Sequence, residues 1–128
     1  MNTLTPRDIR EVWPGVRAGL DAVLEHGGDW RPEDVYAACV NGDAHLWMSD
    51  EGAFCVLQLQ TNPFTRELEL FIWAAWTPGH GPLPAYFLQV REIAREAGAT
   101  LMRMRSTRKG WTRIPYWTED MTEYTSEV

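Results

Sequence analysis

The chain contains 128 residues, with a mass of 14.7 kDa and a formal net charge of −6. Its length fits one domain, which we place at residues 1–128, and a content of 45% hydrophobic and 23% charged residues excludes a disordered chain. No apolar run reaches the roughly 18 residues of a membrane span. The first ten residues lack the apolar segment of a secretory signal, so we expect a cytoplasmic protein with no membrane contact.

The first forty residues predict two helices. Thr5-Pro6-Arg7-Asp8 is typical of a helix start, because it offers a hydroxyl cap, a proline at the first helical position and an acid in the first turn. Apolar residues then recur at helical spacing as far as Leu24, and Pro14 predicts a kink or break near Trp13. A shorter helix is expected from Pro32 to about Val40.

The rest of the chain predicts a mixed sheet. Three strands joined by short turns form an antiparallel meander, and a helix then crosses over to a strand that is parallel to the third. The expected strands are Ala44–Met48, Ala53–Thr61, Glu67–Trp76, Thr100–Ser106 and, after a short connector, Glu119–Glu127, and the crossover helix is Leu83–Gly98. This order defines an α+β fold with two N-terminal helices.

Neither the cysteines nor the histidines predict a metal site. Cys39 and Cys55 stand in apolar segments without a CxxC spacing, which favours reduced core residues over a disulfide. His26, His45 and His80 are far apart in the sequence and do not show the spacing of zinc ligands.

Basic residues concentrate late in the chain. Between Arg91 and Arg113 seven basic residues stand against two acidic ones, although the chain as a whole is acidic. This asymmetry favours an anionic ligand or a complementary protein surface, and the overall acidity disfavours nucleic acid as a partner. A set of solvated ion pairs is the alternative interpretation.

The loop after the third predicted strand carries a glycine pattern. It reads Trp76-Thr77-Pro78-Gly79-His80-Gly81 before a helix, and such a loop suits a phosphate group because backbone N–H groups are accessible there. Glycine and proline also serve turn geometry alone.

With the order of elements, this loop resembles that of the GNAT superfamily of acyl-CoA N-acyltransferases. The family motif is Gln or Arg, two residues, Gly, one residue, and Gly or Ala. The resemblance implies that Trp76, Gly79, His80 and Gly81 hold the pyrophosphate of acetyl-CoA. Trp76 departs from the family's Gln or Arg, and Pro78 and Pro82 remove backbone donors.

Two carboxylates on the third predicted strand are candidates for catalysis. Glu67 and Glu69 alternate with leucines, so both face one side of the strand. The GNAT resemblance implies that one of them deprotonates an amine, and that a tyrosine protonates the departing thiolate. Tyr116 or Tyr124 could take this second role, and we choose Tyr124 as the candidate. We favour another interpretation, in which both carboxylates pair with Arg103 and Arg105 on the next strand, because an arginine lowers the pKa of the base.

The C-terminal part resembles small GNAT-like proteins that tailed bacteriophages and prophages encode among their virion genes. The residues that carry this resemblance are Ser106, Arg108, Gly110 and Trp111. Tryptophan and arginine are also the favoured anchors of protein interfaces, which predicts a protein partner or self-association. The expected interface residues are Trp111, Trp117, Arg108 and Arg113.

Two functions follow from these observations. We favour an interaction or assembly protein, associated with a phage or prophage virion, that keeps the GNAT fold without acyltransferase activity and without a cofactor. The alternative is an acyl-CoA-dependent N-acetyltransferase with a degenerate phosphate loop, which would use acetyl-CoA. A fold hosts many functions, so the sequence leaves open whether the chain is an enzyme.

Overall fold

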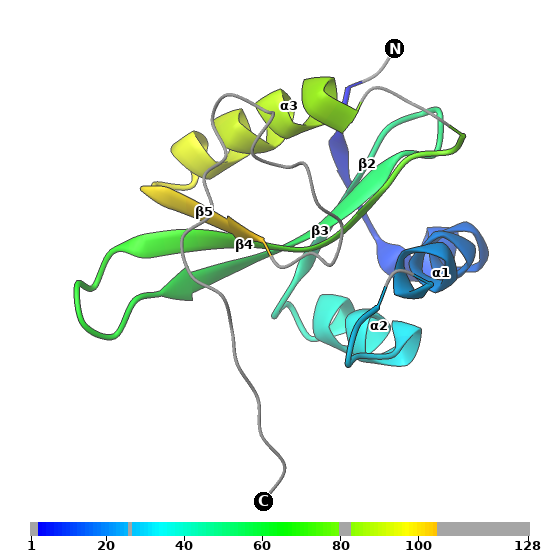
Figure 1. The fold of residues 1–128 in the computed structure, drawn as a ribbon, viewed down its shortest axis with the longest axis horizontal. Coiled ribbons are helices and arrows are strands. Elements are labelled where there is room, and N and C mark those ends of the chain that lie inside the picture. Colours follow the sequence, from blue (N-terminus) through cyan, green and yellow to red (C-terminus); the bar gives the residue numbers. More distant parts are fainter. Residues whose placement is uncertain (1–2, 26, 80–82, 105–128) are drawn as a thin grey trace, which may run out of the picture.

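The computed structural model describes residues 3–25, 27–79 and 83–104. In this part of the chain a mixed sheet has the order β1-β2-β3-β4-β5, with α1 and α2 on one face and α3 on the other (Figure 1). The strands are β1 Thr5–Arg7, β2 His45–Met48, β3 Phe54–Thr61, β4 Leu68–Trp76 and β5 Leu101–Met104, and the helices are α1 Ile9–Leu24, α2 Pro32–Val40 and α3 Leu83–Glu96.

The predicted start of the first helix is wrong by three residues. Thr5–Arg7 forms β1, which pairs antiparallel with β2 at the edge of the sheet. Pro6 fits there because an edge strand tolerates a residue without an N–H donor. Helix α1 starts at Ile9 instead, and Asp8 is its N-cap: the carboxylate accepts a hydrogen bond of 3.0 Å from the backbone N–H of Arg10.

Of the kink or break predicted near Trp13, the break does not occur. Helix α1 continues through Pro14 to Leu24. Pro14 lies on the exposed side of the helix, so the carbonyl of Arg10, which loses its helical donor to the proline ring, faces water. An amphipathic helix therefore accommodates this proline without ending.

The remaining predicted elements within the described ranges are confirmed, with small shifts at their ends. Helix α2 has the predicted bounds, and β2, β3 and β4 form the predicted antiparallel meander. Strand β5 pairs parallel with β4 after the α3 crossover, as expected. Helix α3 ends in a Schellman motif: Gly98 has a φ of +85°, and its N–H and that of Ala99 donate to carbonyls of the last turn. The predicted strand Glu119–Glu127 lies outside the described residues.

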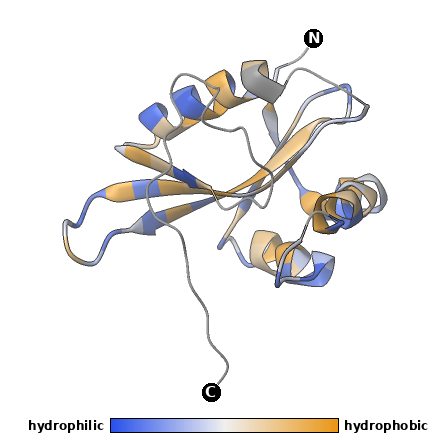
Figure 2. Cartoon of the chain, viewed as in Figure 1, coloured by the Kyte–Doolittle hydropathy of each residue, from blue (hydrophilic) through white to orange (hydrophobic). Residues whose placement is uncertain are grey.

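Two apolar clusters hold the layers together. One joins α3 to the sheet around Leu57, Ile72 and Phe87, and the other joins α1 and α2 to the opposite face around Leu20 and Val56. Both faces of β3 and β4 are therefore covered, and Figure 2 shows hydrophobic residues along these central strands. The hydrophilic residues gather on the outer faces of the helices and at the β3–β4 turn (Figure 2). The α+β fold predicted from the sequence is confirmed.

Candidate functional site

Strand β4 contains a β-bulge. Val56 of β3 pairs with Ala74, but the next residue, Leu57, pairs with Ile72, so Trp73 has no residue opposite it on β3. As a result Trp73 and Ala74, although consecutive, both contact the apolar cluster beneath α1 and α2. A bulge bends its strand and redirects side chains, and bulges are frequent beside active sites.

Within the residues that the structure describes, β5 pairs with β4 as far as the bulge. Its last pair with β4 within the described residues is Met104 with Ile72. From Trp73 to Trp76 the edge of β4 that faces away from β3 has no partner strand in the part of the chain that the structure describes. Unpaired N–H and C=O groups on a strand edge are available to another extended chain that carries amides.

The free edge leads directly to the predicted phosphate loop. Gly79 has a φ of +64°, a conformation that favours glycine, and no atom lies within 4 Å of the place where a Cβ would stand. Helix α3 begins four residues later and has no acidic residue in its first turn. Its positive N-terminal end therefore carries no first-turn carboxylate that would repel an anion. His80 and Gly81, the other predicted loop residues, lie outside the described ranges.

The side chain of Trp76 contributes to the core. Its ring centroid lies 5.8 Å from that of Phe54, and the ring packs against Gly19 of α1, where a Cβ would stand 3.0 Å from Cδ2 of Trp76. Trp76 is thus directed to the α1 side of the sheet, and only its backbone belongs to the free edge. The polar contact that the family's Gln or Arg implies is absent at this position.

The cavity that the described residues leave beside the start of α3 is small. This cavity, lined among others by Cys55, Thr77 and Tyr86, has a volume of about 10 Å³. This volume holds at most one water molecule. A ligand at this site would therefore lie along the edge of β4, outside the core.

The predicted ion pair across β4 and β5 is confirmed for one of its two carboxylates. Arg103 Nε donates to Oε2 of Glu69 at 2.6 Å, and Nδ2 of Asn62, in the β3–β4 turn, donates to Oε1 at 2.9 Å. The Arg103 guanidinium, followed by the Asn62 amide, holds the pKa of the buried Glu69 carboxyl below its usual value. Glu67 is exposed and accepts a long hydrogen bond of 3.4 Å from Thr100.

Asn62 was not predicted as part of this network. Its side-chain oxygen accepts from the backbone N–H groups of Phe64 and Thr65, while its amide donates to Glu69. The Asn-Pro dipeptide predicts a turn, but the contact with Glu69 depends on how β3 and β4 are paired. One residue therefore fixes both the turn and the carboxylate.

The sequence also did not predict a pair of tryptophans at the bulge. The ring centroids of Trp30, from the α1–α2 loop, and Trp73 lie 6.1 Å apart, with an interplanar angle of 77°. This edge-to-face contact brings the α1–α2 loop to the bulge of β4. No local pattern reveals such a contact, because the two residues are far apart in the sequence.

Several predicted residues cannot be placed. The candidate acid and the candidate interface residues lie outside the described ranges: Tyr124, Trp111, Trp117, Arg108 and Arg113. The same holds for Arg105, the second arginine of the predicted ion pairs. Among the residues that are described, no group of three His, Cys, Asp or Glu side chains is placed to bind a metal ion, and no helix is long and apolar enough to cross a membrane.

Solved structures of acetyltransferases resemble the fold closely. A ribosomal-protein-alanine N-acetyltransferase from Brucella melitensis biovar Abortus 2308 matches with a TM-score of 0.73 and 11% identity, over 100% of this chain and 99% of that chain. A predicted acetyltransferase from Clostridium acetobutylicum, solved with acetyl-CoA, matches with a TM-score of 0.70 and 13% identity, over 99% and 96%. A GNAT family acetyltransferase from Staphylococcus aureus gives a TM-score of 0.68 and 11% identity, over 100% and 98%.

These comparisons define the fold. No family model matches the sequence, and no curated protein does either. At identities of 11–13% the structural likeness shows the fold alone. The part of the chain that the structure describes has the GNAT fold, as the order of its elements predicted.

Proposed function

We propose that this chain is an N-acyltransferase that takes an acyl group from acyl-CoA and transfers it to an amine. The observation that carries the proposal is the bulge in β4, after which a strand edge that no described residue pairs with leads from Trp73 to the glycine loop at Gly79. A strand inside a sheet normally pairs with a neighbour along both of its edges. An extended ligand with amides in its middle and phosphates at one end fits the edge that begins at Trp73.

The residues that would hold acyl-CoA are mainly backbone groups. The amides of the ligand's pantetheine arm would pair with the edge of residues 73–76, and its pyrophosphate would lie at Gly79 and the N-terminus of α3. The chemistry that the bound ligand supplies is an activated thioester. The predicted roles of His80 and Gly81 in this loop stay part of the proposal.

The two candidate carboxylates are some distance from the bulge. At about 3.3 Å per strand residue, Glu69 lies about 13 Å and Glu67 about 20 Å from Trp73 along β4. A proton from the acceptor amine would reach Glu69 only through water. The low pKa of Glu69 makes it a weak base, so we assign it chiefly to holding β5 beside β4 through Arg103. Tyr124 stays the proposed donor of a proton to the thiolate.

The comparisons favour this proposal over the assembly protein that the sequence suggested first. The similar structures described above are acetyltransferases by name, and one of them was solved with acetyl-CoA. The residues expected at a protein interface lie outside the described ranges, and the likeness to phage proteins stays a prediction from the sequence.

Binding of acetyl-CoA tests the proposal directly. A ligand that binds only the folded state stabilises it by about 2.7 kcal/mol at a concentration one hundred times its Kd. We expect 1 mM acetyl-CoA to raise the Tm of the purified chain by several degrees. The absence of any shift at this concentration would contradict the proposal.

Two glycine variants show where acetyl-CoA binds. Gly79→Ala strains a residue with φ +64° in the loop, and Gly52→Ala strains one with φ +93° in the β2–β3 turn. Neither methyl would meet another atom within 4 Å, so both variants lose comparable stability from the backbone alone. Only Gly79→Ala should reduce the shift caused by acetyl-CoA. An equal response in the two variants would place the ligand elsewhere.

A further inference from the structure

The bulge of β4 places an indole where the free edge begins. Trp73 contacts the apolar cluster on the α1 and α2 side and is only partly buried. If acyl-CoA lies along residues 73–76 with its phosphates at Gly79, its thioester end is directed to Trp73. The amine that receives the acyl group must therefore approach this indole, and the inference below rests on the proposed function.

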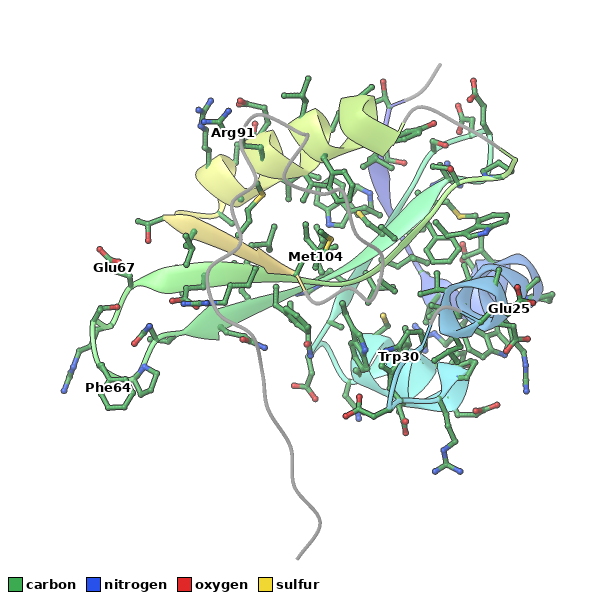
Figure 3. The ribbon with its side chains drawn as sticks, viewed as in Figure 1. Glu25, Trp30, Phe64, Glu67, Arg91 and Met104 are labelled. Carbon is green, nitrogen blue, oxygen red and sulfur yellow. The ribbon has the colours of Figure 1, made fainter. Side chains whose placement is uncertain are left out.

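The α1–α2 loop is shaped to hold a second indole against the first. A Cβ on Gly28 would stand 3.1 Å from Nε1 of Trp30 and 2.9 Å from Cδ2 of Leu24. Gly27, with a φ of +108°, turns the chain just before this contact. Both glycines thus allow Trp30 to lie over the loop backbone and reach Trp73, and Figure 3 shows Trp30 between α2 and the sheet.

Neither tryptophan is fully buried. Because they meet edge to face at 77°, each ring leaves at least one face that the other does not cover. Both side chains are partly exposed. The face of tryptophan is the strongest cation–π acceptor among the side chains, and it also packs against the methylene groups of an alkyl amine.

The surroundings of Trp30 are strongly negative. Residues 21–34 contain five carboxylates and one arginine. Glu33 is paired with Arg17 at 2.9 Å, and Asp34 accepts from the backbone N–H of Arg31, but Asp21, Glu25 and Asp29 are exposed and make no ion pair within the described residues.

The end of α1 adds to this negative potential. The last turn of the helix has no basic residue, so nothing on α1 offsets the negative end of its dipole. Figure 3 shows Glu25 at this end of the molecule, on the same side of the sheet as Trp30.

We infer that Trp30 and Trp73 form the subsite for the acceptor, and that the acceptor is a small amine with at least two positive charges. One nitrogen loses its proton to water and attacks the thioester carbonyl, so that a C–N bond forms, the C–S bond breaks, and the CoA thiolate leaves and takes up a proton. The other nitrogen stays charged, lies against the indole faces and is attracted by the carboxylates of the α1–α2 loop. An acceptor with a single amino group loses this second interaction when its nitrogen reacts.

The experiment uses the full chain and two probes at equal ionic strength, spermidine and n-butylamine. Indole N–H signals in ¹H–¹⁵N spectra are assigned with single Trp→Phe variants, and each probe is then titrated. We expect spermidine to shift the signals of Trp30 and Trp73 and to bind at least tenfold more tightly than n-butylamine. Equal affinity for the two probes, or shifts confined to other tryptophans, would overturn the inference.

Variants separate recognition from folding. Trp30→Leu should weaken spermidine binding about tenfold, and Trp30→Phe, which keeps an aromatic face, should retain part of the affinity. Trp13→Leu is the matched control, because Trp13 also makes an edge-to-face contact, with Tyr36 at a centroid distance of 4.9 Å, in the same layer of the molecule. Equal loss of affinity in Trp13→Leu and Trp30→Leu would refute a specific subsite.

A separate measurement tests the proposed acyltransferase function independently of amine binding. The Tm shift with acetyl-CoA, measured on the same samples without amine, reports binding of the acyl donor. Spermidine binding at Trp30 without an acetyl-CoA shift would support the cation subsite and reject the acyltransferase. An acetyl-CoA shift without spermidine binding would reject the subsite alone.

Discussion

Replacing Gly19 with alanine should destabilise the domain, although alanine is the better helix former. A methyl group at this buried position of α1 would stand 2.4 Å from Cε2 and 2.8 Å from Cζ of Phe54, and 3.0 Å from Cδ2 of Trp76. Both rings are packed in the core, so the helix must move away from the sheet. Overpacking costs about 1–3 kcal/mol, while alanine gains about 1 kcal/mol over glycine in a helix. We expect a net loss of up to about 2 kcal/mol.

Gly15 provides the matched control. It lies one turn earlier in α1, and a methyl there meets no atom within 4 Å, so Gly15→Ala should gain about 0.5–1 kcal/mol. Urea unfolding followed by circular dichroism measures both variants, with the m-value as a check that the unfolded states are alike. If Gly19→Ala stabilised the domain as much as Gly15→Ala, the packing of Trp76 on α1 described above would be incorrect.

Three further predictions concern the Glu69 network and the thiols. The lowered pKa of Glu69 gives stability that is present above about pH 4 and is lost as the pH falls through the folded pKa, so Glu69→Gln should lower the Tm more at pH 7 than at pH 3. Glu67→Gln removes an exposed carboxylate and is the control; the same pH dependence in both variants would contradict the ion pair. Asn62→Ala should speed amide hydrogen exchange at residues 64–66, and unchanged protection there would show that the turn does not depend on this side chain. Burial raises the pKa of Cys55 to about 12 and of Cys39 to about 11, so Ellman's reagent at pH 7 should modify Cys39 first and Cys55 only on unfolding; faster reaction of Cys55 would contradict its burial.

The central elements were predictable because their signals are local. The apolar runs of β2, β3 and β4 are separated by turn residues, and α2 starts at Pro32 with acids in its first turn. Strand β1 has no such signal. Thr5-Pro6-Arg7 is exposed and polar, and it is a strand only because residues 46–48 lie beside it. Its strongest local feature, a proline after a hydroxyl residue, favours a helix start instead.

The sequence did not predict the bulge in β4, for a different reason. A shift in the pairing of a strand is visible in the sequence when one face is polar, since the alternation of polar and apolar residues then changes phase. Residues 70–76 of β4 are apolar on both faces, because α3 covers one face and α1 and α2 cover the other. The position of Trp73 depends on the register with β3, which no local pattern contains.

The structure also changes how the departure of Trp76 from the GNAT motif is interpreted. Compared with the GNAT motif, this tryptophan is a departure, and in the sequence it counted against a ligand site. In the fold the indole of Trp76 packs against Gly19 of α1, which has no side chain and so leaves room for the ring. The substitution thus belongs to the packing between helix and sheet, whereas the proposed contacts with acyl-CoA come from the backbone of residues 73–76. A backbone edge keeps its donors and acceptors whichever side chain it carries, so Trp76 argues neither for nor against binding. The proposed acyl-CoA site depends instead on the bulge at Trp73 and on the conformation of Gly79.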